Sequence, residues 1–236
     1  MGDIRIKGDE MVKRLCEGGT MKQRYYVLLF IFLFFLSQAS CGKQPGQPGS
    51  AGDTGLILSA TLTPHYNGTD TYSVDVHQEV CDPGPPPVLE IFTDHNAVAT
   101  FTATLERPDL TVLPGTLYIQ QYTIDFYRSS DSVGAPPIAS DRRFTTIVIP
   151  PPAVGSTTPT TVTATLVLVD LTRKLQYYND MLTGQFTSAL NNTDLINNYT
   201  AVYTFYGQND FGDSFSIQAT TNFQIGLFDY CATSGG

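Results

Sequence analysis

The chain offers few side chains whose type and spacing could carry out chemistry. Its three histidines, His65, His77 and His95, lie too far apart for a metal-binding motif such as H-E-x-x-H. There is no G-x-S-x-G elbow around a serine and no glycine-rich phosphate loop. Asp210 and Asp213 could offer oxygens to Ca²⁺, but aspartates between two strands more often form the turn itself. We therefore predict no catalytic residue, no metal ligand, no cofactor and no enzymatic activity.

An apolar run near the N-terminus has the features of an export signal. Lys22 and Arg24 precede residues 26–36, which read YVLLFIFLFFL. The run is too short to span a membrane, which needs about 20 residues, and small residues follow it, as in secretory signals. We expect residues 21–40 to be a signal peptide that begins at Met21, and residues 1–20 to lie before the true start.

The end of this signal carries a motif with a chemical meaning. Residues 36–41 (LSQASC) resemble the lipobox of bacterial lipoproteins, in which the cysteine is lipidated and the signal is cut before it; Gln38 departs from the apolar residue usual there. The resemblance implies lipidation of Cys41 and attachment to the cell envelope. Gly42 is not the Asp that retains such proteins in the inner membrane of enteric bacteria, so the outer membrane is expected. The alternatives are a soluble exported protein, cut after Ala39, and an uncleaved anchor.

The segment after Cys41 reads as a tether. Residues 42–55 (GKQPGQPGSAGDTG) contain no large apolar side chain, and glycine recurs at every third position from Gly46 to Gly55. Three such triplets are too few for a collagen helix. We expect residues 41–55 to form a flexible coil with an end-to-end distance of about 20 Å.

Two cysteines remain once Cys41 is assigned to the anchor and Cys16 to the leader. Cys81 and Cys231 are an even pair in an exported, disulfide-permissive compartment. We predict a disulfide between them; two separate buried thiols are the alternative.

Composition excludes two further classes of protein. Hydrophobic residues make up 42% of the chain, which is enough for a core and argues against a disordered polyelectrolyte. The net charge is −9, and it becomes −11 from Cys41 onward, where seven basic residues stand against eighteen acidic ones. Because phosphate binding needs clustered Lys and Arg, nucleic acid is not an expected partner, and any membrane contact depends on Cys41.

The remaining chain has the pattern of an all-β protein. Apolar and polar residues alternate along about eight segments, which is typical of antiparallel strands with one face in a core. Pro- and Gly-rich turns separate these segments. Among the turns, only residues 150–159 have the composition of a linker. One helix could follow Asp170, because four apolar side chains have helical spacing. These are Leu171, Leu175, Tyr178 and Leu182. We predict an antiparallel, immunoglobulin-like β-sandwich of about eight strands as one domain over residues 56–231; two small sandwiches that share an interface are the alternative.

Two segments carry a resemblance to immunoglobulin-like domains. Residues 122–128 (YTIDFYR) and the terminal hairpin from Tyr203 to Ala219 look like strands of that fold. With the lipobox, the chain resembles uncharacterised lipoproteins of environmental Gram-negative bacteria. The tryptophan of antibody-type domains is absent, since the chain has no Trp. The resemblance implies a fold and a location but assigns no site.

Two functions follow as expectations. The first is a non-catalytic binding or structural module of the envelope, with an unknown protein or glycan as partner and its function in the loops. The alternative is a carbohydrate-active or other hydrolytic accessory protein. A concave site that gathers two carboxylates, or a histidine with partners, would favour the hydrolase, and a closed sandwich with polar loops would favour the module.

Overall fold

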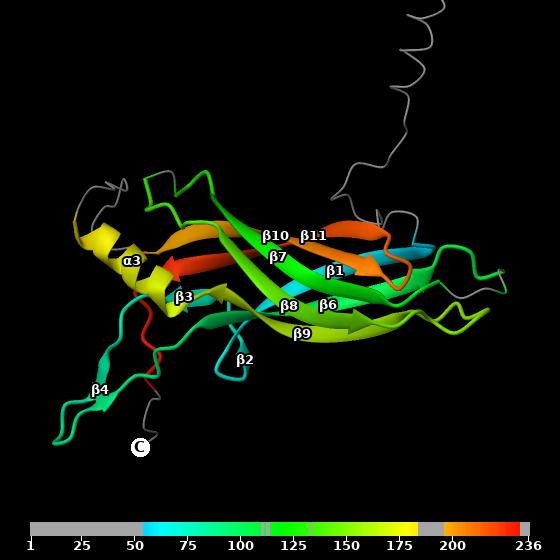
Figure 1. The fold of residues 1–236 in the computed structure, drawn as a ribbon. Helices are drawn as coiled ribbons and strands as arrows, with labels where there is room; N and C mark the ends of the chain where they lie inside the picture. Colours follow the sequence, from blue (N-terminus) through cyan, green and yellow to red (C-terminus); the bar gives the residue numbers. More distant parts are fainter. Residues whose placement is uncertain (1–53, 110, 112–113, 133, 184–195, 232–236) are drawn as a thin grey trace, which may run out of the picture. The chain divides into compact units, whose positions relative to one another are not determined.

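The computed structural model describes residues 54–109, 111, 114–132, 134–183 and 196–231. The expected leader, the signal peptide, Cys41 and the tether up to residue 53 lie outside these residues, as do residues 184–195 of a long connection. Strands make up most of the regular structure (Figure 1).

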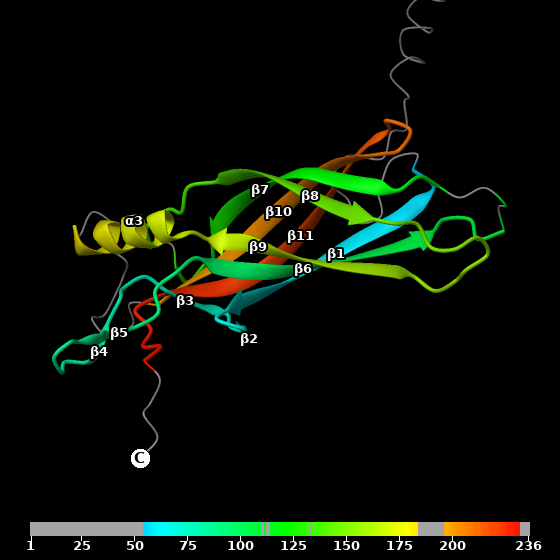
Figure 2. The ribbon, with the colours of Figure 1, turned by 60° about the horizontal axis from the view of Figure 1, so that its bottom comes forward.

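Two larger sheets form the body. One has the order β2-β1-β6-β9 and the other the order β3-β11-β10-β7-β8 (Figures 1 and 2). A separate two-stranded sheet joins β4 to β5. The strands are β1 (Leu56–Tyr66), β2 (Thr69–Asp70), β3 (Ser73–Asp75), β4 (Val80–Asp82), β5 (Val88–Leu89), β6 (His95–Leu105), β7 (Leu117–Arg128), β8 (Asp141–Ile149), β9 (Thr160–Val169), β10 (Asn197–Asn209) and β11 (Ser214–Gly226).

The two larger sheets share one apolar core. Strict alternation along β6 buries Ala97, Ala99, Phe101 and Ala103, while the threonines between them stay half-buried. Phe101 meets Phe205 of the other sheet edge-on, with ring centroids 4.9 Å apart. Alternation of this kind gives each sheet one apolar face, and burial of the two faces against each other is the main stabilising term.

The sheets differ from the expected pattern in two ways. The expectation of purely antiparallel strands is wrong at one edge, because β3 pairs with β11 in parallel. No hairpin joins these two strands, so their relative direction is not restricted to antiparallel. The described residues also contain eleven strands rather than about eight. The additional strands, β2, β4 and β5, have only two or three residues, too few for alternation to reveal them.

One segment expected as a single strand is divided. Val74 and Val76 are buried beside β11, as their alternation predicts, but Tyr72 and Val80 are exposed. The chain leaves the sheet after Asp75, and Val80 begins the separate β4–β5 hairpin.

The helix expected after Asp170 is present, but its buried face is not the one predicted. Helix α3 spans Leu171–Leu182. Leu175 is 48% exposed and Leu182 is 67% exposed, whereas Lys174 and Tyr177 are buried. The burial of Tyr177 is fixed by tertiary contacts, since its hydroxyl accepts a hydrogen bond from Asn197 Nδ2 at 2.9 Å. The leucine spacing correctly indicates a helix. The packing of Tyr177 against Tyr199, however, turns the face with Lys174 and Tyr177 toward the core and leaves Leu175 and Leu182 exposed.

A partly buried ion network fixes the start of α3. The Asp170 carboxylate caps the helix by accepting from Arg173 N at 2.8 Å, which satisfies one free backbone N–H of the first turn. It also pairs with the side chains of Arg173 and Arg143, the latter at 2.7 Å. Asp141 of β8 pairs with the same two arginines, at 2.5 Å to Arg143 and 3.2 Å to Arg173. The helix is thereby attached to the edge of the five-stranded sheet.

Replacement of this cap tests the attachment. Asp170→Ala is expected to lower the free energy of unfolding by about 2 kcal/mol, because it removes the cap and leaves two arginines with one carboxylate. Asp109→Ala is the matched control, because Asp109 pairs with Arg107 while both are exposed; its effect is expected to stay within about 0.5 kcal/mol. Denaturant unfolding of both variants measures the difference, and equal values would contradict the role of the network.

Candidate functional site

Four buried titratable side chains gather where α3, the end of β3, the start of β6 and the segment after β5 meet. They are Asp75, Glu90, His95 and Lys174. Each has one side-chain nitrogen or oxygen without a hydrogen-bond partner among the described residues. We call this set the buried charge cluster. Buried polar atoms are nearly always paired, so four unpaired ones in one place mark a functional candidate.

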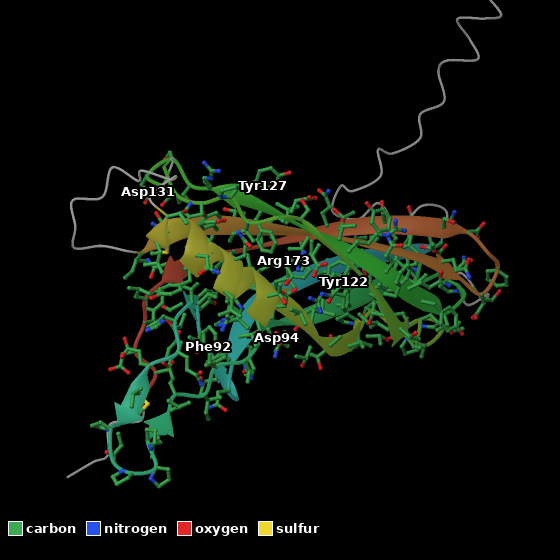
Figure 3. The ribbon with its side chains drawn as sticks, turned by 60° about the vertical axis from the view of Figure 1, so that its left-hand side comes forward. Phe92, Asp94, Tyr122, Tyr127, Asp131 and Arg173 are labelled. Carbon is green, nitrogen blue, oxygen red and sulfur yellow. A yellow bond between two sulfur atoms is a disulfide. The ribbon has the colours of Figure 1, made fainter. Side chains whose placement is uncertain are left out.

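Lys174 contributes the ammonium group of the cluster. Its position on the inner face of α3 leaves the side chain 0% exposed. Nζ lies 4.9 Å from the ring centroids of both Tyr66 and Phe92, a cation–π arrangement. Burial lowers the pKa of Lys174 to about 8, and the opposite charges of Asp75, Asp94 and Glu90 limit that fall. Figure 3 shows this end of the body, with Phe92 and Asp94 labelled near α3.

Asp75 connects the end of β3 to the C-terminal segment. Its Oδ1 accepts from Phe228 N at 3.0 Å and from His77 N at 3.3 Å, while Oδ2 has no partner among the described residues. Burial raises the pKa of this carboxyl, although the backbone donors and Lys174 act in the opposite direction.

His95 is held as a neutral imidazole. Its Nε2 donates to the carbonyl oxygen of Thr71 at 2.8 Å, so Nε2 carries the proton and Nδ1, which is unpaired, does not. The ring stacks on Tyr66 with an interplanar angle of 3°. Burial is the main cause that lowers the pKa of His95 to about 4, and the charge of Lys174 adds to it.

Glu90 follows β5, and its side chain is 97% buried. Its Oε2 accepts from Glu79 N at 3.3 Å, and Oε1 has no partner among the described residues. Burial is the main cause that raises the pKa of Glu90, and the nearby charge of Asp75 adds to it. Gln78 Nε2 donates to the Glu90 carbonyl at 2.9 Å and fixes the backbone at this point.

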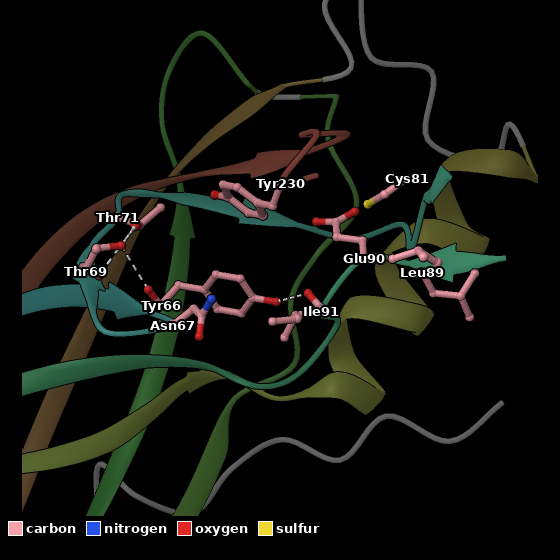
Figure 4. Close-up of a pocket in the computed structure, with 10 residues that line it drawn as sticks. Tyr66, Asn67, Thr69, Thr71, Cys81, Leu89, Glu90, Ile91 and Tyr230 are labelled. Atoms are coloured by element: carbon pink, nitrogen blue, oxygen red, sulfur yellow. Dashed lines mark hydrogen bonds between the residues drawn. The ribbon is translucent and has the colours of Figure 1, made fainter. Parts of the chain in front are cut away.

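A cavity of about 490 Å³ lies against the cluster, and Glu90 forms part of its wall (Figure 4). We call it the Glu90 cavity. Tyr66 and Tyr230 also line it, and their hydroxyls donate to the carbonyl oxygens of Ile91 and Ser73. Asp75, His95 and Lys174 are not among its lining residues. The size suits a small molecule or one side chain of a partner. Its lining includes Tyr66, Thr71, Cys81, Leu89, Glu90 and Tyr230.

Cys81 and Cys231, the pair left over in the sequence, are joined by a disulfide at the edge of this cavity. Their Cα atoms lie 5.2 Å apart. The bond attaches the β4–β5 hairpin to the end of the C-terminal segment. Cys41, the expected lipidation site, lies outside the described residues.

The other residues singled out in the sequence lie away from this site or make structural contacts. Asp210 accepts from Thr116 N at 2.8 Å, and Asp213 accepts from Asn209 Nδ2 at 2.9 Å, so both shape the β10–β11 turn. His65 pairs with Asp70 at 3.1 Å. His77 lies outside the strands and stacks on Tyr178, with ring centroids 4.8 Å apart. Within the described ranges, no three His, Cys, Asp or Glu side chains gather as a metal site.

Sequence reasoning missed most of the cluster. Asp75, Glu90 and Lys174 were not singled out, because each is an isolated charge in its own segment. The sequence held one signal for Lys174. It lies three residues before Tyr177, so the two side chains share one face of the helix, and this is the face that is buried. Across the part of the chain that the structure describes, no helix has the length and hydropathy that crossing a membrane requires.

Comparison with known proteins adds little to this description. No protein-family model matches the chain, and no curated protein matches it. Among solved structures, a crystal structure of a protein from Archaeoglobus fulgidus is similar with 7% identity and a TM-score of 0.33, covering 64% of this chain and 96% of that one. A solution structure of a protein from Arabidopsis thaliana has 12% identity and a TM-score of 0.30, covering 67% and 84%. At these scores neither likeness supports an inference about fold or function.

Proposed function

We propose that the protein is an exported lipoprotein, held to the cell envelope through Cys41, whose folded body is a non-catalytic binding module. The observation that supports binding is the Glu90 cavity, which has a buried carboxylate with one unpaired oxygen in its wall. Binding sites are concave and mostly apolar, with few polar groups that fix orientation, and this cavity has that character.

The same geometry argues for a module over a hydrolase. Asp75 and Glu90 belong to one cluster, which is the observation that favours the hydrolytic alternative. Hydrolysis of a glycoside uses two carboxyl groups that both reach the substrate, but of these side chains only Glu90 lines the cavity, while Asp75 and His95 are buried and do not line it. A bound substrate would therefore meet one of the two required groups.

We further propose that the body is a variant of the immunoglobulin-like sandwich. Its support is the two sheets that share one core, together with the resemblance of residues 122–128 and the terminal hairpin to strands of that fold. The parallel β3–β11 edge and the helix α3 are departures from that pattern.

A fractionation experiment tests the anchor. The full chain, produced in a Gram-negative host, is expected to sediment with outer membranes and to gain the mass of acyl chains at its new N-terminus. Cys41→Ala is expected to move it to the soluble fraction, because acyl chains supply the membrane affinity, about 0.8 kcal/mol per buried CH₂. Soluble wild-type protein cut after Ala39 would contradict the anchor while leaving the binding module open.

Photo-crosslinking in the native envelope tests the binding end. Benzoylphenylalanine in place of Leu89 lies at the Glu90 cavity, and the same group in place of Phe211 lies at the β10–β11 turn, at the opposite end of β11. Both side chains are exposed, at 51% and 71%, so the group can reach a partner from either position. Crosslinked products are expected at Leu89 only, and products only at Phe211 would place binding elsewhere.

A further inference from the structure

The unpaired polar group in the wall of the Glu90 cavity is an acceptor. Glu90 Oε1 has no partner among the described residues, whereas the hydroxyls of Tyr66 and Tyr230 already donate to main-chain carbonyls. Thr71 Oγ1 is also used, in a bond to Thr69 O at 3.4 Å. Glu90 Oε1 is thus an acceptor without a donor in this structure, so a ligand that reaches it must supply an N–H or O–H group.

The charges behind this wall favour a cationic donor over a neutral one. The negative charges of three carboxyl groups, those of Asp75, Asp94 and Glu90, act on the one ammonium group of Lys174. Lys174 does not neutralise Glu90 directly, because Nζ lies over the rings of Tyr66 and Phe92 without a hydrogen-bond partner in the described structure. A buried carboxylate is costly unless it is paired, so a second cation at Glu90 would relieve the imbalance. The net charge of −11 from Cys41 onward adds a long-range attraction for a cation.

The remaining walls suit an apolar stem. Val88, Leu89 and Ile91 line the cavity from the β4–β5 side, and the rings of Tyr66 and Tyr230, 5.3 Å apart, line it from the other. Aromatic rings attract an ammonium group on their faces, as Tyr66 already does for Lys174. An alkyl chain that ends in an ammonium group matches both the apolar walls and the acceptor.

We propose that the Glu90 cavity binds a primary alkylammonium group, with the Glu90 carboxylate as its counter-ion and its stem against the apolar and tyrosine walls of the cavity. This inference rests on the proposed binding function and names its ligand chemistry. The group could belong to a free amine or to a lysine side chain of a partner protein, and both share this chemistry. On binding, the Glu90 side chain turns Oε1, which is buried and has no partner among the described residues, toward the cavity, and the ammonium N–H donates to it.

Titration of the full chain in detergent solution tests the proposal. Pentylammonium chloride and pentan-1-ol are added separately to protein with ¹³C-labelled tyrosine, and the ring signals of Tyr66 and Tyr230 report on the cavity rather than on the micelle. Pentylammonium is expected to give saturable shifts, with an affinity at least about tenfold above that of the alcohol. Equal affinities, or no saturation by pentylammonium up to roughly 10 mM, would overturn the proposal.

A matched pair of variants locates the counter-ion. Glu90→Gln is expected to weaken pentylammonium binding by about 30-fold and to leave the affinity for pentan-1-ol unchanged. The substitution keeps an oxygen acceptor at this position but removes its negative charge, which only the ammonium group requires. Glu106→Gln makes the same chemical change at an exposed site just beyond the far end of β6 and is expected to leave both affinities unchanged. If Glu90→Gln does not fold, the comparison of ammonium with alcohol on the wild-type chain decides alone. Equal losses in the two variants would overturn the assignment.

A third arm distinguishes the two sources of the amine. A Leu-Lys-Leu tripeptide with an acetylated N-terminus and an amidated C-terminus, so that the lysine Nζ is its one ammonium group, is compared with the same peptide acetylated on Nζ as well. Binding of the free form alone supports a lysine side chain of a partner; binding of pentylammonium but of neither tripeptide supports a free amine. Equal binding of the acetylated form would overturn the ammonium proposal. Crosslinks at Leu89 that survive Glu90→Gln would retain the binding module while rejecting the ligand chemistry.

Discussion

Removal of the Cys81–Cys231 disulfide is expected to lower the free energy of unfolding by as much as about 5 kcal/mol. The bond closes a loop with a sequence separation of 150 residues, and in the chain-entropy account a loop of this length gives about that figure as an upper value. For a domain of this size the loss corresponds to a fall in Tm of roughly 10 to 20 °C. Thermal unfolding of Cys81→Ala/Cys231→Ala measures the effect.

The reductant provides the control for this prediction. A reducing agent should lower the Tm of the wild-type chain to that of the double variant and leave the double variant unchanged. Peptide mass spectrometry without reductant should recover the two cysteine peptides as one linked species. Two thiols that react with an alkylating agent in the folded protein would contradict the bond.

The bond also has a local consequence at the Glu90 cavity. Cys81 is part of the lining, and the segment after β11 that contains Cys231 is held to β3 by the hydrogen bond from Phe228 N to Asp75 Oδ1. Without the disulfide, the β4–β5 hairpin retains its short two-stranded sheet and the contacts of Glu90 with Glu79. We therefore expect the double variant to bind pentylammonium more weakly than the wild type even below its Tm, because the cavity walls come from segments that the bond holds together.

The strands could be predicted from the sequence wherever alternation is long. In β1, β6, β9 and β11 each apolar residue at every second position points to the shared core, so the period of two determines both the strand and its inner face. The short strands β2, β4 and β5 lack this signal. The parallel pairing of β3 with β11 also could not be read, because it depends on tertiary packing and not on the local pattern.

The buried charge cluster could not be predicted, for a physical reason. Its members, Asp75, Glu90, His95 and Lys174, come from four different segments, and each is an isolated charged or polar side chain in its own segment, for which a solvated position is the simpler expectation. Only the close approach of α3 to β3 and β6 brings them together. The side chains that the sequence did favour, Asp210 and Asp213, had good spacing for a turn, and they form one.

His95 is expected to make the protein sensitive to acid. Its pKa is about 4 in the folded state against an ordinary value of 6.5, so between these values the unfolded chain binds more protons than the folded one. The contribution of His95 to stability is therefore complete above about pH 6.5 and is lost as the pH falls toward 4, by about 3 kcal/mol. Protonation must occur at Nδ1, which is buried without an acceptor in the described structure and is further opposed by the charge of Lys174.

The two carboxyl groups of the cluster change the stability with pH in the opposite direction to His95, so the measurement must separate the two effects. Burial raises the pKa values of Asp75 and Glu90, so their folded forms take up protons more readily than their unfolded forms as the pH falls, and this opposes the loss at His95. A single pH profile of the wild-type chain would mix the two effects. The difference between wild type and a variant at position 95 cancels the carboxyls and isolates the histidine.

Denaturant unfolding of wild type and His95→Gln at pH 6.5 and pH 4 measures this difference. Glutamine can retain a donor toward Thr71 O but cannot titrate, so the wild type should lose about 3 kcal/mol more than the variant over this interval. Phe101→Leu is the control, because it weakens the core without removing a titratable group, and its loss with pH should equal that of the wild type. Equal losses in wild type and His95→Gln would show that His95 is not held neutral, and the packing of Tyr66, His95 and Lys174 would then be looser than the geometry implies.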